Sequence, residues 1–181
     1  MKEAEQSAGQ SVLQHGESVH AYYVDLINHL RNNAELKLEW KLPQWLLEFK
    51  QQILDGQLNF DDVRMYQIMH DCGKPFCMTY DEQGKKHFAN HAQVSYNTWL
   101  TVSDNLDIAN LILHDMDIHT IKADDVVDFC KLPYAMTLLL TGLCEVHSNA
   151  EMFGGVESTS FKIKWKQIDR RGNAICKTQK A

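Results

Sequence analysis

The chain has 181 residues, of which 44% are hydrophobic and 23% are charged, and its formal net charge is −6. These values are ordinary for one globular domain and argue against wholesale disorder. No stretch approaches the roughly 18 consecutive apolar residues of a membrane span, and no Cys-x-x-Cys pair suggests a thiolate zinc ribbon.

The five cysteines are odd in number and scattered, and the first residues lack the apolar core of a secretory signal. We therefore expect a protein of the reducing cytoplasm. From Phe161 to Ala181, seven basic residues stand against one acid, so this segment carries +6 and the remainder −12. The acidic body disfavours long double-stranded nucleic acid, whereas the basic segment suits either a phosphorylated ligand or a purely solubilising role.

Residues 1–17 show no clear pattern and are expected to form a flexible lead-in. The spacing of apolar residues predicts a helix from Ser18, a second over 44–55 and a third from about 61 up to Gly73. Residues 76–88 are typical of strand, turn and strand around Gly84. Further helical patterns lie at about 89–102, 105–118, 123–130 and 133–153.

The C-terminal segment alternates Phe161, Ile163 and Trp165 and then reads DRRGN, which predicts a second hairpin. The expected fold class is therefore all-α, a helical bundle with small β-hairpins near 76–88 and 160–177. We expect one helical domain over 18–155, with the basic hairpin of residues 156–181 packed on it.

The segment HDCGKP, which begins at His70, ends one of the expected helices. The adjacent imidazole and carboxylate of His70 and Asp71 can both bind one divalent cation. Lys74 then places a positive charge beside that cation, where it suits a phosphate oxygen. A His-Asp pair alone is common at helix ends, but the longer string is more specific.

Three further histidines, His20, His91 and His114, fall on or beside expected helices. Each by itself is best explained as an ordinary half-buried side chain. Together with His70 and Asp71 they can form a mononuclear or dinuclear site, because helical bundles build metal sites from side chains that converge across facing helices.

Several stretches resemble the HD-domain metal-dependent phosphohydrolases, most closely the HD domain attached to some bacterial CCA-adding tRNA nucleotidyltransferases. They are SVHAYYVDL, MHDCGKP, KKHFANHAQVS, LILHDMDIHTI and LLLTGLCEVHSNAEMFGG, within residues 18–155. The resemblance implies the HD-type helical bundle with one or two bound divalent cations. The nucleotidyltransferase head has no counterpart, so a stand-alone hydrolase is implied.

The resemblance also implies roles for individual residues. The implied metal ligands are His20, His70, Asp71, His91, His114 and Glu145. Asp71 and Lys74 are the implied catalytic residues, since Asp71 would orient the attacking water and Lys74 would neutralise phosphate oxygens. Further substrate contacts are expected from Lys74, Arg64, His87 and His119.

The chain departs from the family pattern in two places. Glu145 stands where the family normally has an aspartate, and Asp115, Asp117 and His147 are alternatives for this last ligand. The spacing between the first histidine and His70 is longer than in the tRNA-enzyme domain, so His29 is an alternative to His20.

The implied activity is that of a phosphomonoesterase or phosphodiesterase. Its substrate would be a phosphorylated nucleotide or a short RNA end, including 2′,3′-cyclic phosphates and 2′-phosphates. Mixed imidazole and carboxylate ligands suit Mn²⁺, Ni²⁺, Co²⁺, Fe or Zn²⁺ better than Mg²⁺. The sequence leaves the oligomeric state open.

Two other interpretations remain at this stage. The chain could be a catalytically weak HD fold that serves as a nucleotide-binding or protein-interaction module. Alternatively, it could be a helical domain whose histidines are incidental, in which case His20, His70, His91 and His114 should lie scattered.

Overall fold

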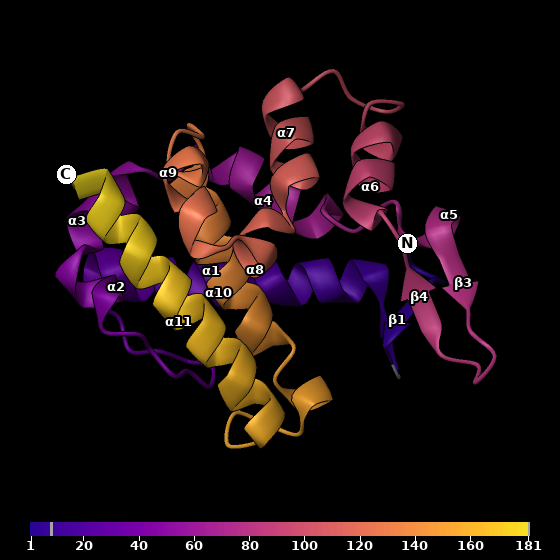
Figure 1. The fold of residues 1–181 in the computed structure, drawn as a ribbon, viewed down its shortest axis with the longest axis horizontal. Coiled ribbons are helices and arrows are strands. Elements are labelled where there is room, and N and C mark those ends of the chain that lie inside the picture. The colour runs from indigo at the N-terminus through magenta and orange to yellow at the C-terminus, as the bar shows by residue number, and fades with distance from the viewer. Residues whose placement is uncertain (8, 181) are drawn as a thin grey trace.

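The computed structural model describes residues 1–7 and 9–180. Within these ranges the chain is mostly helical, with two antiparallel two-stranded hairpins, so the expected all-α class with small hairpins is confirmed (Figure 1). Among the described residues, no helix combines the length and apolar character that crossing a bilayer requires.

The strands are β1 (Glu5–Ser7), β2 (Gln10–Ser11), β3 (Met78–Tyr80) and β4 (Lys86–Phe88). The α-helices are α1 (Val12–Asn32), α2 (Trp45–Glu48), α3 (Lys50–Asp55), α4 (Phe60–Met69), α5 (Lys74–Cys77), α6 (His91–Trp99), α7 (Leu106–His114), α8 (Asp117–Thr120), α9 (Val126–Phe129), α10 (Ala135–Ser148) and α11 (Thr159–Lys180). Two short 3-10 turns are η1 (Ala123–Asp125) and η2 (Glu151–Phe153).

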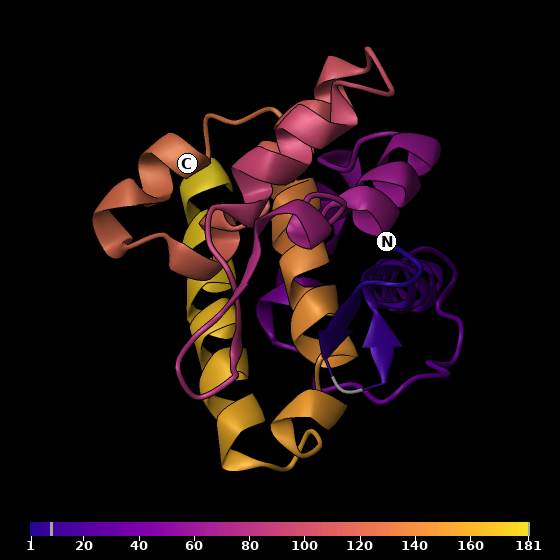
Figure 2. The same cartoon turned by 90° about the vertical axis from the view of Figure 1, so that its right-hand side faces the viewer.

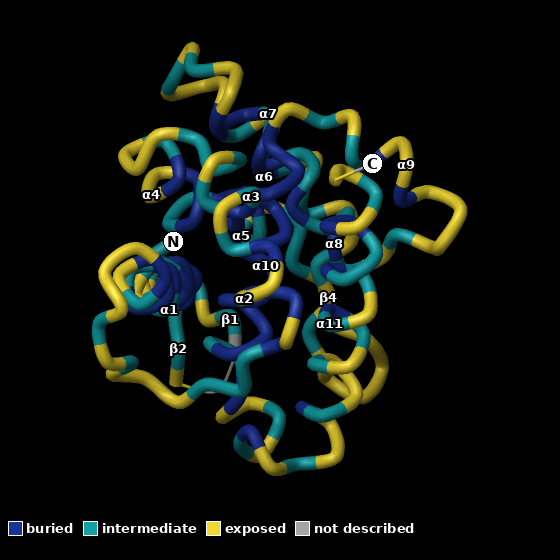
Figure 3. The backbone as a smooth tube through the Cα atoms, turned by 90° about the vertical axis from the view of Figure 1, so that its left-hand side faces the viewer, coloured by how far each residue is buried: buried dark blue, intermediate teal, exposed yellow. Residues whose placement is uncertain are grey.

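Helix α10 is the central element of the bundle. Every residue from Ala135 to His147 is buried, as expected for a helix that is apolar on nearly all sides. Helix α1 packs on one side of α10, and α11 runs beside it on another (Figure 2). The tube coloured by burial shows the same core, with α10 and the inner side of α1 in dark blue (Figure 3). Polar side chains on α10 are therefore held inside the fold.

Helix α1 begins at Val12, earlier than the expected start at Ser18, because Ser11 forms a capping box. The Ser11 hydroxyl accepts from the Gln14 backbone N–H at 3.2 Å, and the Gln14 side-chain oxygen accepts from the Ser11 N–H at 2.9 Å. The preceding residues form the β1–β2 hairpin. The segment 1–17 thus contains a hairpin and the first turns of α1.

The first expected hairpin is confirmed, since Met78 pairs with Phe88 and Tyr80 with Lys86. The second, near 160–177, is wrong because these residues form helix α11. The alternation of apolar residues there is short, whereas the buried Phe161, Ile168 and Ile175 recur every seven residues, which is the helical repeat.

Gly172, expected in a turn, lies inside α11. A Cβ atom at this position would come within 2.4 Å of the Trp45 ring, so glycine allows α11 to pack directly against α2. This glycine therefore reflects close packing of two helices.

A second glycine allows the crossing of α1 and α4. A Cβ atom on Gly16 would lie 2.5 Å from the Ile68 carbonyl oxygen and 2.8 Å from that of Gln67. Both contacts are with backbone, which cannot rotate away as a side chain can. The absence of a side chain at residue 16 therefore lets the start of α1 lie directly against the end of α4.

The loop between α1 and α2 is tied to α1 by Asp25. Its carboxylate accepts from the backbone N–H groups of Lys37 and Leu38 at 3.0 Å and from the Trp40 indole at 2.9 Å. Burial alone would raise the pKa of the Asp25 carboxyl, but these donors outweigh it and hold that pKa below its ordinary value of 3.8.

We expect Asp25→Asn to lower the free energy of unfolding near neutral pH by about 1–3 kcal/mol, because three donors lose part of their charged acceptor. The contribution of a carboxyl whose pKa is lowered by folding is complete above its unfolded-state pKa, and it is lost as the pH falls through the folded-state pKa. Urea unfolding at a series of pH values should therefore show a gap between wild type and variant that narrows only below about pH 4. Asp104→Asn, in the exposed loop before α7, is the control, and equal stabilities of wild type and Asp25→Asn near neutral pH would contradict the anchoring role.

We expect Gly16→Ala to destabilise the chain by about 1–3 kcal/mol, because the new methyl group overlaps backbone carbonyls of α4. Helix propensity alone would act the other way, since alanine is better than glycine by about 1 kcal/mol inside a helix. Thermal or urea unfolding gives the sign directly, and a stabilised variant would show that the crossing is open. The exposed neighbour Glu17→Ala is the matched control.

Candidate metal centre

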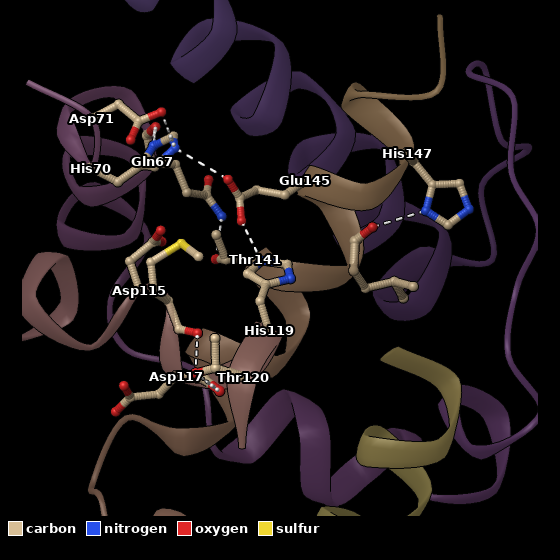
Figure 4. Close-up of polar contacts among 12 residues, drawn as sticks. Gln67, His70, Asp71, Asp115, Asp117, His119, Thr120, Thr141, Glu145 and His147 are labelled. Carbon is tan, nitrogen blue, oxygen red and sulfur yellow. Dashed lines mark hydrogen bonds and ion pairs between the residues drawn. The ribbon is translucent and has the colours of Figure 1, made fainter. Parts of the chain in front are cut away.

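The centre lies where the ends of three helices meet. His70 and Asp71 directly follow α4, and Glu145 lies near the end of α10 (Figure 4). His15 lies in the first turns of α1. The close crossing at Gly16 places the adjacent His15 so that its ring centroid lies 5.3 Å from that of His70. The site is thus assembled from residues far apart in the sequence.

Nitrogen and oxygen atoms of these side chains converge in the interior. His70 Nε2 lies 3.2 Å from Asp71 Oδ2 and 3.3 Å from Glu145 Oε1, and His15 Nε2 lies 3.6 Å from the same Glu145 oxygen. One ligand atom from each of His15, His70 and Glu145 can be chosen so that all three lie within 4.8 Å of one another. His15, His70 and Asp71 are each only 1% exposed.

The hydrogen bond made by His70 Nδ1 determines the protonation of Nε2 in the neutral ring, and Nε2 is the atom that faces the carboxylates. His70 Nδ1 lies 2.8 Å from the Gln67 carbonyl oxygen and donates to it, so in the neutral ring Nε2 carries a lone pair. This lone pair faces oxygens of Asp71 and Glu145 without an aligned hydrogen bond, and Asp71 Oδ1 is also buried without a hydrogen-bond partner in the described chain. Converging acceptors in a buried place repel one another unless a cation lies between them. The donor set therefore fits a divalent metal ion.

The close approach of these charged groups shifts the pKa values of His70 and Asp71. Burial alone would raise the pKa of Asp71, but the neighbouring His70 and Lys74 hold it well below its usual range. Burial would likewise lower the pKa of His70, yet the Asp71 and Asp115 carboxylates raise it well above its usual value. Positive charge is thus strongly favoured between these acceptor atoms. Without a metal ion the second proton of His70 supplies that charge, and a bound cation would take the place of this proton.

Two neighbours hold the carboxylates in position. His119 Nε2 donates to Glu145 Oε2 at 2.6 Å, which leaves Oε1 directed towards His15 and His70. The Tyr66 hydroxyl donates to Asp115 Oδ1 at 2.5 Å. Burial, followed by the nearby Glu145 charge, raises the pKa of Asp115. The orientation of Glu145 is therefore fixed from outside the cluster.

Lys74 and Gln6 cover the outer side of Asp71. Lys74 Nζ lies 2.5 Å from Asp71 Oδ2. Gln6, on strand β1, satisfies both of its amide atoms when its nitrogen donates to Asp71 Oδ2 at 3.0 Å and its oxygen accepts from Lys74 Nζ at 3.2 Å. In this orientation the oxygen also lies 3.2 Å from His15 Nε2. The N-terminal hairpin therefore contributes an amide directly at the centre.

The centre opens into a cavity of about 280 Å³. His91 lines it, with Nε2 3.7 Å from Asp71 Oδ1 and with Nδ1 donating to the Phe88 carbonyl at 3.0 Å, so the neutral ring presents a lone pair towards the cavity. Other lining residues are Gln6, His15, Asp71, Lys74, Asp115, Met116, His119, Glu145, Val146, Asn149, Met152, Phe153 and Lys164. A larger depression of about 620 Å³ adjoins it through Asn149 and Met152 but contains no histidine or lysine.

Six of the residues expected at the site are brought together around this cavity, namely His70, Asp71, Lys74, His91, His119 and Glu145. His119 was expected to contact substrate, and it also holds the Glu145 carboxylate. Glu145, which was expected as the last metal ligand, therefore contacts His70.

Four of the expected residues lie elsewhere. His20 contacts Gln67 Oε1 through Nδ1 at 2.8 Å, and Gln67 in turn donates to Thr141. His114 pairs with Asp117 beside another depression. The exposed His87 pairs with Asp81, and Arg64 is exposed on α4 and does not line the cavity.

The alternatives left open by the sequence also have other partners. His29 Nδ1 contacts the Ala34 carbonyl at 2.8 Å near the end of α1. His147 points away from Glu145 on the opposite side of α10 (Figure 4), where it donates to the Leu143 carbonyl and accepts from the Lys41 N–H. Burial lowers the pKa of His147 to about 4, which suits this neutral role.

Sequence reasoning missed His15, although a signal for it exists. The buried stripe of α1 contains Val19, Tyr23 and Leu26, and one turn back along the same face from Val19 is His15 rather than His20. No comparable signal identifies Gln6, because its contacts depend on how a separate hairpin docks.

No protein-family model matches this chain, and no curated protein and no solved structure is similar enough to it to count as a match. The assignment of a function therefore depends on the geometry of the centre and on the resemblance of individual motifs.

Proposed function

We propose that the chain is a divalent-metal-dependent phosphohydrolase that acts on a nucleotide or RNA-end phosphate. The observation that carries this proposal is the convergence of ligand atoms from His15, His70 and Glu145, all within 4.8 Å of one another, beside the buried atoms His70 Nε2 and Asp71 Oδ1, which have no hydrogen-bond partner in the described chain. His15, His70, Asp71 and Glu145 would hold the ion, which is Mn²⁺, Ni²⁺, Co²⁺, Fe or Zn²⁺ in preference to Mg²⁺.

A divalent cation at this place supplies Lewis acidity to a phosphoryl oxygen and to an attacking water near neutral pH. Lys74 then neutralises a non-bridging phosphate oxygen, in exchange for part of its contact with Asp71. His91 accepts a hydrogen bond at the cavity side through its free Nε2, which suits it to orient a water molecule or to bind a second cation.

The substrate class follows from size and charge. A cavity of about 280 Å³ suits a ligand of about the size of a mononucleotide, whereas a duplex is far larger. Outside the basic segment the chain carries −12, which disfavours a long polyanion. The motif resemblance makes 2′,3′-cyclic phosphates and 2′-phosphates the first substrates to test, within a cytoplasmic setting.

For metal binding, we expect Mn²⁺ or Ni²⁺ at about a hundred times its dissociation constant to raise the melting temperature of EDTA-treated chain by about 5–10 °C. His15→Ala and Glu145→Gln should lose this shift, because each removes one of the converging ligands. His87→Ala is the matched control, since His87 is exposed and pairs with Asp81. Unchanged affinity in His15→Ala, measured by calorimetry, would exclude this centre as the metal site.

For catalysis, we expect Mn²⁺-dependent hydrolysis of bis-p-nitrophenyl phosphate that is lost with EDTA. Asp71→Asn should lower kcat by about 10²–10⁴-fold and Lys74→Gln by about 10²–10³-fold, because they remove charges beside the reacting phosphate. Lys85→Gln, on the exposed β3–β4 turn, is the charge-matched control. The same chain is then screened with 2′,3′-cyclic and 2′-phosphorylated nucleotides. A metal-loaded chain without turnover of any of these compounds would contradict the hydrolase and leave a nucleotide-binding module.

A further inference from the structure

One lysine of α11 occupies a position that the helical repeat assigns to the core. Lys164 comes three residues after the buried Phe161 and four before the buried Ile168, so it falls on the side of α11 that faces the bundle. Its side chain is nevertheless exposed, because it lines the cavity of the candidate metal centre. The cavity beside this part of α11 explains how a charged side chain, Lys164, can lie on the side of the helix that faces the core.

The Lys164 ammonium is also uncompensated. Across residues 1–7 and 9–180 no carboxylate lies within ion-pair distance of it, whereas Lys74 contacts Asp71 and Lys162 contacts Glu157. Of the seven basic residues in the C-terminal segment, Lys164 is the one that lines this cavity in the described chain. It is therefore available to an anionic ligand inside the cavity.

The cavity presents two cationic side chains from separate elements. Lys74 is on α5 beside the metal ligands, and Lys164 is on α11. The lining also includes the apolar side chains Met116, Val146, Met152 and Phe153, together with the amide of Asn149. Apolar side chains suit the faces of a sugar and a base, and the amide suits a hydroxyl or a ring nitrogen.

We propose that Lys164 binds a second phosphate of the substrate, so that the preferred substrates are ribonucleotides with two phosphate groups. One phosphate lies at Lys74 and the metal centre, and the other lies at Lys164, with the nucleoside between the two lysines. The second phosphate has two chemical sources, a free nucleoside bisphosphate and the phosphodiester next to an RNA end. This inference rests on the proposed phosphohydrolase function and names its substrate class.

Kinetics of the wild type and two variants test the subsite. Wild type, Lys164→Gln and Lys166→Gln are assayed with Mn²⁺ on p-nitrophenyl phosphate, which has one phosphate, and on adenosine 2′,5′-bisphosphate, which has two. We expect Lys164→Gln to raise KM for the bisphosphate about tenfold with kcat little changed, and to leave p-nitrophenyl phosphate unaffected. Lys166, exposed on the same helix but outside the cavity lining, is the matched control and should change neither. An equal effect of Lys164→Gln on both substrates, or no effect, would overturn the proposal.

Calorimetry separates a failure of this subsite from a failure of the hydrolase. Adenosine 2′,5′-bisphosphate is titrated into the Mn²⁺-loaded chain and its Lys164→Gln and Lys166→Gln variants. Binding that weakens about tenfold only in Lys164→Gln supports the subsite even if no turnover occurs. Binding that is absent, or indifferent to Lys164, overturns it even if p-nitrophenyl phosphate is hydrolysed. A 2′-phosphorylated dinucleotide in the same titration shows whether the RNA-end source is preferred.

Discussion

The convergence of buried imidazoles and carboxylates from separate helices is the constraint around which the centre is arranged. In its neutral form His70 gives its one proton to a backbone carbonyl of α4, so a second proton or a cation is required between Nε2 and the two carboxylates in front of it. In a buried place such an arrangement is costly, because acceptors that cannot reach water repel one another. A second proton on His70 supplies the compensating charge when no ion is bound, and on the proposed function a divalent cation would replace this proton.

The same centre depends on packing that leaves its side chains little freedom. Helix α10 is surrounded by other elements and presents Glu145 from within the core, while His119 holds the second oxygen of that carboxylate. On the opposite wall, the glycine of α1 lets its backbone lie against the end of α4, so His15 and His70 share one face of the site. Ligands placed on rigid helices keep their geometry better than ligands on loops.

How much of the site could be predicted from sequence depends on how local each signal is. His70, Asp71 and Lys74 are neighbours in the chain, so their proximity needs no tertiary information. The choice between His15 and His20 depends on which side of α1 faces the core, and this could have been read from the stripe that contains Val19. The C-terminal helix could also have been predicted, since Phe161, Ile168 and Ile175 follow a seven-residue repeat. The alternation of apolar and polar residues from Phe161 to Trp165 instead suggested a strand. The position of Gln6 could not be predicted, because it requires the two hairpins to meet through an ion pair between Glu5 and Lys86.

The amide of Gln6 makes ligand entry an exchange reaction. A group that approaches the Lys74 ammonium has to replace the Gln6 oxygen, and one that approaches Asp71 Oδ2 has to replace the Gln6 N–H donor. A neutral oxygen brings no gain over the amide that it displaces, whereas a doubly charged oxyanion does, because hydrogen bonds to ionised groups are about twice as strong. On the proposed function, the Gln6 amide would therefore compete with the substrate at a fixed local concentration, and this competition would disfavour weakly charged metabolites without any steric barrier.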